Sequence, residues 1–152
     1  MKKFIILLVI SLSAIIAHAE SLFESCENTP GITTVYVSKT MISLAGDLDI
    51  GSDNMNLSSI ASKIDGIWIM TAEGDKAAIL RNKVKTAFND KKYEKLMSVR
   101  DDGDNVDILM ATPGGNKNEC IIKAIAETDA TVIIMRGSFT LQDIIAATKA
   151  AH

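Results

Sequence analysis

The stretch ECIIKAIAETDATVIIMRG, residues 119–137, decides the fold of this chain. Isoleucine and valine are frequent in both halves of it, and β-branched residues of this kind favour strands. Between the halves, TDA at residues 128–130 interrupts the apolar pattern with residues that are typical of turns. The stretch therefore predicts two strands that pair as an antiparallel hairpin.

Two further strand-like runs precede it, YEKLMSVR at residues 93–100 and VDILMAT at residues 106–112. The connections between the runs are DDGDN at residues 101–105 and PGGNKN at residues 113–118, and both contain residues that form hairpin turns. Four consecutive runs with short turns between them predict a four-strand antiparallel meander.

The first half of the chain mixes strand and helix patterns. Strands are predicted at ITTVYVS, residues 32–38, and at IWIMTA, residues 67–72. Apolar residues at helical spacing predict helices over residues 38–46, 57–66, 75–88 and 140–150. Thr140 and Asp143 have the spacing of a capping box at the start of the last helix. Because helices with one apolar face need a sheet to pack on, the fold class expected is a two-layer α+β domain, with a mixed sheet that ends in the four-strand meander.

The N-terminus has the pattern of a signal peptide. After a positively charged start, residues 4–16 form an apolar run of 13 residues, which is shorter than the ~20 residues of a membrane-spanning helix. The small residues Ala17 and Ala19 follow, and this pattern predicts cleavage between Ala19 and Glu20. A lipoprotein would carry its cysteine directly after the run, whereas Cys26 lies ten residues further on. We therefore expect a periplasmic or secreted protein that is not a lipoprotein and has no membrane span after cleavage.

The expected organisation is a signal peptide at residues 1–19, an N-terminal extension at residues 20–31 and a single α+β domain at residues 32–152. The formal net charge is −3, and removal of Lys2 and Lys3 with the signal peptide changes it to −5. An acidic chain without a basic run is not expected to bind nucleic acid or an anionic membrane surface.

Cys26 and Cys120 are the two cysteines of the chain, and export favours disulfides. A bridge between them would close a loop of about 95 residues and could stabilise the fold by ~4 kcal/mol. The alternative is that Cys120 is a small buried core residue and Cys26 a free thiol near the terminus. The sequence leaves both interpretations open.

The residues that most short catalytic motifs need are missing. His152 is the only histidine after the expected cleavage site, and it is the last residue of the chain. Ser–His and Cys–His pairs and histidine-ligated metal sites all need an ordered imidazole. The chain also lacks GxSxG, SxxK, HExxH, a Walker-type GK[ST], GxGxxG and CxxC. We therefore expect no catalytic residues and no cofactor, although a hydrolase that depends on carboxylates or on a lysine would leave no short motif.

Two acidic stretches contain side chains of the kind that bind calcium. GDLDIGSDNMN, residues 46–56, has oxygen ligands at suitable spacing, but it lacks the glycine and the final glutamate of an EF-hand loop. RDDGDNVD, residues 100–107, has Gly103 and Asn105 in the pattern of a hairpin turn. We expect a solvated loop and a turn, respectively, and no metal site.

Single residues with two interpretations include Trp68, Arg136 and the methionines. Trp68 lies between two isoleucines, which favours a core position over a ligand-facing one. Arg136 ends an apolar strand, and it either terminates the buried stretch or pairs with an acid at a surface site. Core filling is favoured over an adaptable binding surface for most of the methionines, which are Met41, Met55, Met70, Met97, Met110 and Met135.

Four segments, taken together, resemble the domain of unknown function 4252 family, exported envelope proteins found mainly in Bacteroidetes. The segments are VYVSKTMISLAGDLD at 35–49, SSIASKIDGIWIMTAE at 58–73, YEKLMSVRDDGDNVDILM at 93–110 and IIMRGSFTLQDI at 133–144. The resemblance implies export and, because genes of the family are often found near envelope-stress type sigma factors, a role in envelope homeostasis or signalling. It implies no activity and no site residue.

The sequence thus predicts a non-enzymatic, exported domain that binds an envelope protein or a small ligand. One alternative is the carboxylate- or lysine-dependent hydrolase without a short motif, for which paired carboxylates of raised pKa in a pocket would be evidence. Another is a self-associating structural protein. A flat apolar patch or an exposed sheet edge would favour the binding domain.

Overall fold

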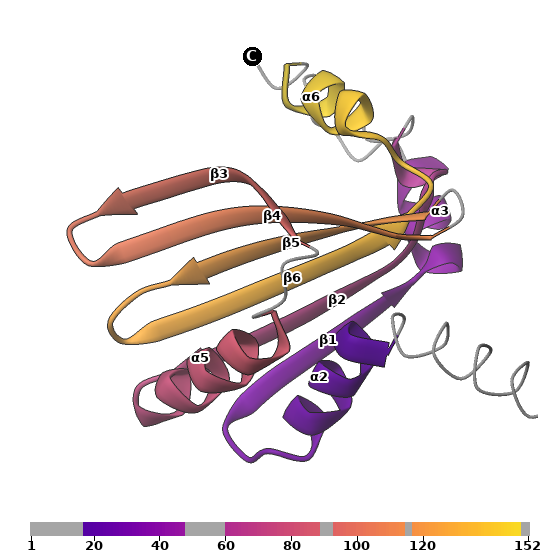
Figure 1. Cartoon of the computed structure of the whole chain (residues 1–152). Coiled ribbons are helices and arrows are strands. Elements are labelled where there is room, and N and C mark those ends of the chain that lie inside the picture. Colours follow the sequence, from indigo (N-terminus) through magenta and orange to yellow (C-terminus); the bar gives the residue numbers. More distant parts are fainter. Residues whose placement is uncertain (1–16, 48–59, 89–92, 115–116, 150–152) are drawn as a thin grey trace, which may run out of the picture.

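The structure is a computed structural model, and it describes residues 17–47, 60–88, 93–114 and 117–149. Six strands form one sheet in the order β1-β2-β6-β5-β4-β3, and every neighbouring pair is antiparallel (Figure 1). The strands are β1 (Ile32–Ser38), β2 (Ile64–Glu73), β3 (Glu94–Asp101), β4 (Asp104–Gly114), β5 (Lys117–Ile125) and β6 (Asp129–Gly137).

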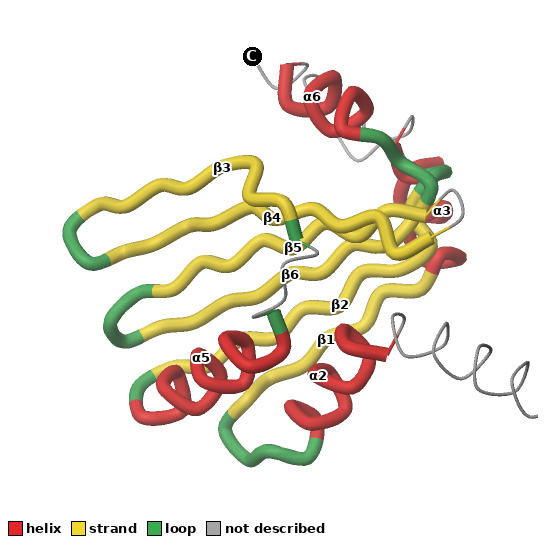
Figure 2. Tube along the Cα trace, in the orientation of Figure 1, coloured by secondary structure: helices red, strands yellow, loops and turns green. Residues whose placement is uncertain are grey.

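Four helices are described, so the α+β class expected from the sequence is confirmed. The helices are α2 (Ala17–Glu27), α3 (Lys39–Asp47), α5 (Asp75–Ala87) and α6 (Leu141–Lys149). Helices α2 and α5 lie side by side on one face of the sheet, and α3 and α6 lie near one end of it (Figures 1 and 2).

The expectation of a mixed sheet is wrong. Strand β1 runs antiparallel to β2, with Ser38 opposite Gly66 and Ile32 opposite Ala72. The connection between these strands starts and finishes at the same end of the sheet, so it acts as a long hairpin loop. A parallel pair would have required the chain to cross to the opposite end before β2 began.

The main core lies between the sheet and helices α2 and α5. Alternate strand residues point to this side, which we call the helix face of the sheet. Its buried residues are Leu22, Phe23, Cys26, Ile32, Met70, Ala72, Ala77, Leu80, Val84, Phe88, Leu109, Ile121, Ala130, Val132 and Ile134. Helix α2, which lies mostly in the N-terminal extension expected at residues 20–31, contributes three of them, Leu22, Phe23 and Cys26.

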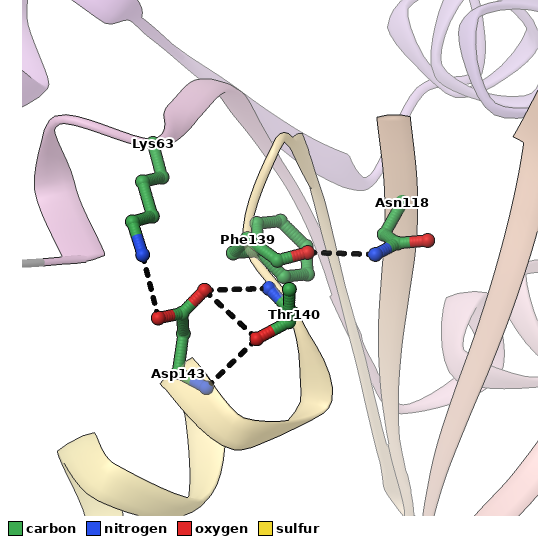
Figure 3. Close-up of polar contacts among 5 residues, drawn as sticks. All are labelled: Lys63, Asn118, Phe139, Thr140 and Asp143. Atoms are coloured by element: carbon green, nitrogen blue, oxygen red, sulfur yellow. Dashed lines mark hydrogen bonds and ion pairs between the residues drawn. The ribbon is translucent and has the colours of Figure 1, made fainter. Parts of the chain in front are cut away.

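A smaller core lies on the other side of the sheet, near the end where α3 and α6 pack. It contains Ile42 of α3, Phe139 and, partly buried, Ile144 of α6. Asn118 Nδ2 donates a hydrogen bond of 2.7 Å to the carbonyl oxygen of Phe139 (Figure 3). This bond fixes the segment that leads from β6 into α6.

Helix α6 begins with the capping box that the sequence predicted. Asp143 Oδ2 accepts hydrogen bonds from the backbone N–H of Thr140 at 2.7 Å and from its hydroxyl at 3.0 Å, and the Asp143 N–H donates to Thr140 Oγ1 at 3.2 Å. The other carboxylate oxygen accepts a bond of 2.6 Å from Lys63 Nζ (Figure 3). Two orphan N–H groups of the first turn are thereby satisfied, and the helix is held to the segment before β2.

The predicted helix over residues 57–66 is only partly helical. Its residues 57–59 lie outside the described part of the chain, the helix ends at Ala61, and β2 already begins at Ile64. Close packing here explains the early strand, because a Cβ on Gly137 would lie 2.1 Å from the Lys63 carbonyl oxygen. The two backbones therefore approach each other directly, and the pairing overrides the helical periodicity.

Within the described residues, none of the helices combines the length and the apolarity that crossing a membrane requires.

Candidate interaction surface

The sheet face opposite α2 and α5 carries a continuous row of apolar side chains, and we call this side the open face. One residue from each strand contributes, and each is the register partner of the next. In sheet order the row is Val35, Ile69, Ile133, Ile122, Ile108 and Met97. With strands ~4.8 Å apart, this central row extends ~24 Å across the sheet.

The rows on either side of the central row differ in character. Towards α3 and α6, the next row contains Val37, Ile67, Met135, Cys120, Met110 and Glu94, and all of these except the exposed Glu94 belong to the smaller core or pack against it. Towards the β3–β4 and β5–β6 turns, the next row is small and uncharged and contains Thr33, Thr71, Thr131, Ala124, Val106 and Val99. The central row and this turn-side row together form a two-row surface without a charged side chain.

Acidic residues border this surface at the turn end. Glu73 of β2 is the register partner of Asp129 of β6, and Asp101 of β3 is the partner of Asp104 of β4. Strand alternation places all four on the open face, one row beyond the turn-side row, and all four are exposed. We call these four residues the acidic rim.

Burial differs sharply between the two faces of the same strands. On the helix face, Met70, Val132 and Ile121 are each 0% exposed. Their neighbours on the open face, Ile69, Ile133 and Ile122, are partly exposed. The ends of the central row, Val35 and Met97, are 45% exposed, and Val99 in the turn-side row is 47% exposed. Among the described residues, the members of these two rows lie outside both cores, except Ile108, which packs against the smaller core, and an apolar surface of this kind is typical of interaction sites.

On the helix face, Arg136 forms an ion pair with the buried carboxylate of Glu119. Its Nε and Nη2 lie 3.2 and 2.9 Å from Glu119 Oε2, and Glu119 is only 4% exposed. Tyr93 donates a hydrogen bond of 2.9 Å to Glu119 Oε1, and Arg136 Nη1 contacts Glu20 Oε1 at 3.3 Å. Arg136 therefore pairs with an acid, as one of the two interpretations expected, but its main partner is buried and not at a surface site.

Trp68 also lies on the helix face, where it packs against the main core. Its ring lies 5.2 Å from that of Tyr36 and 5.3 Å from the Arg136 guanidinium carbon, measured between ring centroids and from the ring centroid, respectively. The core interpretation of Trp68 is therefore confirmed. The ring also packs closely over Gly66, where an added Cβ would lie 2.9 Å from it.

The candidate disulfide between Cys26 and Cys120 is not formed. Both are free and buried, Cys26 in the main core beneath α2 and Cys120 in the smaller core on the opposite side of the sheet. A sheet layer separates the two thiols, which the loop-length argument could not foresee. Burial raises the pKa of Cys120 to about 11 and raises that of Cys26 above its usual value, with Lys83 acting in the opposite direction on Cys26.

The remaining candidate residues are not brought together into one site. The expected cleavage junction, Ala19–Glu20, lies in the first turn of α2. The first calcium candidate falls mainly on residues 48–59, outside the described chain, and His152 and Met55 also lie outside it. The second is a tight hairpin turn, as predicted, with Asp102 and Gly103 at φ 47° and 94°. The described residues contain no cluster of three or more potential metal ligands.

Core filling is correct for Met70 but not for all the methionines. Met110 and Met135 are partly buried and pack against the smaller core, whereas Met41 of α3 is 58% exposed and Met97 is 45% exposed. Sequence reasoning placed these side chains in the core because the strand pattern is apolar at successive positions. It could not distinguish a strand covered on both sides from one covered on a single side.

Three polar side chains of the kind that a lysine- or carboxylate-dependent hydrolase uses, Lys83, Asp143 and Asp65, have defined partners in the described chain. Lys83 Nζ contacts Ser25 Oγ between α5 and α2, but the contact is exposed, whereas a lysine base needs a desolvated amine. The pKa of Asp143 is lowered to about 2, chiefly by the Lys63 hydrogen bond and then by the Thr140 N–H. The pKa of Asp65 is also lowered, chiefly by its hydrogen bond to Lys117. Carboxyl groups with a raised pKa would have been the evidence for an acid catalyst.

Comparison with known proteins gives one family. The family model described as "Domain of unknown function (DUF4252)" matches residues 23–147, which confirms the resemblance found in the sequence. No curated protein and no solved structure matches the chain.

Proposed function

We propose that this chain, which belongs to the DUF4252 family of domains of unknown function, is a non-enzymatic binding domain whose open face binds an apolar surface of a partner protein. The observation that carries the proposal is the partly exposed row of apolar side chains that crosses all six strands. Aliphatic side chains left on a sheet face lose contact with water only when a second apolar surface packs on them.

The surroundings of the two open rows indicate the chemistry of the partner. The two rows lack charged residues, and the acidic rim of Glu73, Asp101, Asp104 and Asp129 borders them. A complementary partner therefore presents an apolar centre with lysine or arginine residues at one side. Opposite charges at the border of an interface increase the association rate and fix the orientation of the partner.

We propose that this binding takes place in the bacterial envelope or outside the cell. The support for it is the signal-peptide pattern, with the expected cleavage between Ala19 and Glu20. Arg136 Nη1 contacts the carboxylate of Glu20, the residue that would begin the processed chain, so cleavage at this junction retains the contact. We propose a role in envelope homeostasis or signalling on the family association described above.

The experiment that tests this function compares lysine substitutions on the two faces. Val35→Lys and Met97→Lys each place a charge at an exposed end of the central row, and Ile79→Lys places one on the exposed surface of α5, on the other side of the sheet. Tagged copies are expressed in the native host, the envelope is crosslinked, and the captured proteins are identified. We expect Val35→Lys and Met97→Lys to lose a partner that wild type and Ile79→Lys retain.

The capture results are compared only for variants whose midpoint of unfolding in urea equals that of wild type. Loss of capture in both open-face variants alone supports the proposal. Equal capture by every variant contradicts it. Capture of the chain by itself, with a concentration-dependent dimer on sizing, identifies self-association through the same face, because two apolar sheet faces can stack ~10 Å apart.

A further inference from the structure

A second feature, independent of the open face, is a small cationic cavity on the helix face. It has a volume of about 250 Å³ and lies between the C-terminal half of α5 and strand β5. Its lining is divided equally between cationic and apolar residues. The residues are Arg81, Lys85 and Lys123 together with Val84, Phe88 and Ile125.

Two of the three cations of this cavity have the following partners among the described residues. Arg81 Nη2 donates to the backbone carbonyl oxygens of Ala126 at 2.8 Å and Glu127 at 3.3 Å, and Arg81 Nε is buried without a partner in the described chain. Lys123 Nζ lies 3.8 Å from Asp107 Oδ2, while Lys95 contacts the other oxygen of that carboxylate. The charged side chains among the described residues that line the cavity are all cationic, in a protein whose formal net charge is −3.

A helix terminus explains only part of this arrangement. Lys85 lies in the last turn of α5, where a cation is favoured by the helix dipole. The helix dipole does not account for Lys123, because that residue comes from β5 and lines the cavity across from the helix. Helix α5 and strand β5, which are distant in sequence, therefore both contribute cationic side chains to one cavity that is also lined by apolar residues.

We propose that this cavity binds a small amphipathic anion, a phosphate or carboxylate group attached to a small apolar group. The lysines and the arginine would hold the anionic group, and Val84, Phe88 and Ile125 would contact the apolar part. Cavities of about 150 Å³ can hold benzene, so 250 Å³ is enough for one ring with its headgroup.

The probe is phenyl phosphate. It is titrated by calorimetry into the protein purified in the form in which cells export it. We expect saturable binding of one molecule per chain, a Kd raised at least about threefold by Lys85→Gln and by Lys123→Gln, and a larger increase in the double variant. Lys83→Gln removes the same charge from the same helix but outside this cavity, and it leaves the Kd unchanged. Inorganic phosphate binds more weakly because it lacks the apolar contact, and neutral phenol shows no saturation.

Three results would overturn the proposal. The first is the absence of saturable phenyl phosphate binding by wild type. The second is an equal loss in Lys83→Gln and Lys85→Gln, which would mean diffuse attraction to the helix surface. The third is equal affinity for phosphate and phenyl phosphate, which would remove the role of the apolar residues. None of these measurements depends on the open face, so this inference and the proposed function fail separately.

Discussion

Ile69 of β2 and Ile133 of β6 are register partners in the middle of the open face, and both are partly exposed although they lie on adjacent central strands. The next residue along β6, Ile134, points to the helix face and is 0% exposed. This difference between neighbours of the same type is the basis of the first prediction.

Ile134→Ala should destabilise the protein much more than Ile133→Ala. Removing a fully buried isoleucine side chain creates a cavity and costs about 3 kcal/mol, whereas the same change on the open face should cost about 1 kcal/mol. The free energy of unfolding in urea measures both. Equal losses would mean that the open face is as well packed as the main core, in contradiction to the burial described above.

The buried ion pair between Arg136 and Glu119 should be intolerant of the loss of one partner. Glu119→Leu leaves the Arg136 guanidinium, whose side chain is 13% exposed, without its main carboxylate, and we expect a loss of ~3 kcal/mol in the free energy of unfolding. The double variant Glu119→Leu/Arg136→Met should lose less than Glu119→Leu alone. A single variant within about 0.5 kcal/mol of wild type would show that the pair is not needed.

Much of the fold could be predicted because local signals agree with the final pairing. The strand at residues 32–38, the helix over residues 75–88 and the Thr140–Asp143 capping box all occur where the sequence placed them. The DDGDN turn is also correct, since Asp102 and Gly103 have the positive φ values that a tight hairpin turn requires. In each case the interactions that decide the structure lie within a few residues of one another.

The candidate surface could not be predicted because its information is non-local. Strands such as residues 131–137 are apolar at successive positions, which predicts burial on both faces. Tertiary packing puts both α2 and α5 on the same face of the sheet. Ile133 and its neighbours on the other face therefore stay partly exposed. The helix at Ala17–Glu27 was missed because it overlaps the end of the signal-peptide pattern. The separation of Cys26 from Cys120 by the sheet has the same non-local origin.

The attachment of α6 should depend on pH through Asp143. Its pKa of about 2 in the folded chain lies below the usual 3.8, so its contacts stabilise α6 above about pH 4 and are lost as the pH falls through about 2. Hydrogen exchange of the α6 amides should therefore accelerate, after correction for the intrinsic rate, between pH 4 and 2. In Asp143→Asn the protection should already be reduced at pH 7. An α6 with the same protection at both pH values would contradict the role of this carboxylate.

Both thiols should be present and inaccessible in the folded protein. A raised pKa keeps Cys26 and Cys120 protonated near neutral pH, and burial blocks access to them. A thiol reagent at pH 8 should modify the native chain slowly. In urea, it should modify both cysteines of each chain rapidly. Reduction should leave the intact mass unchanged, and a gain of about 2 Da would show the disulfide that the structure lacks.

The measurement that tests the central claim most directly is site-specific photo-crosslinking in living cells. A benzophenone amino acid replaces Met97 at the end of the central row in one strain and Ile79 on α5 in another, since both side chains are exposed but lie on opposite sides of the sheet. The account predicts a discrete crosslinked protein from position 97 that position 79 does not give. Crosslinks from position 79 alone, or the same products from both positions, would contradict it.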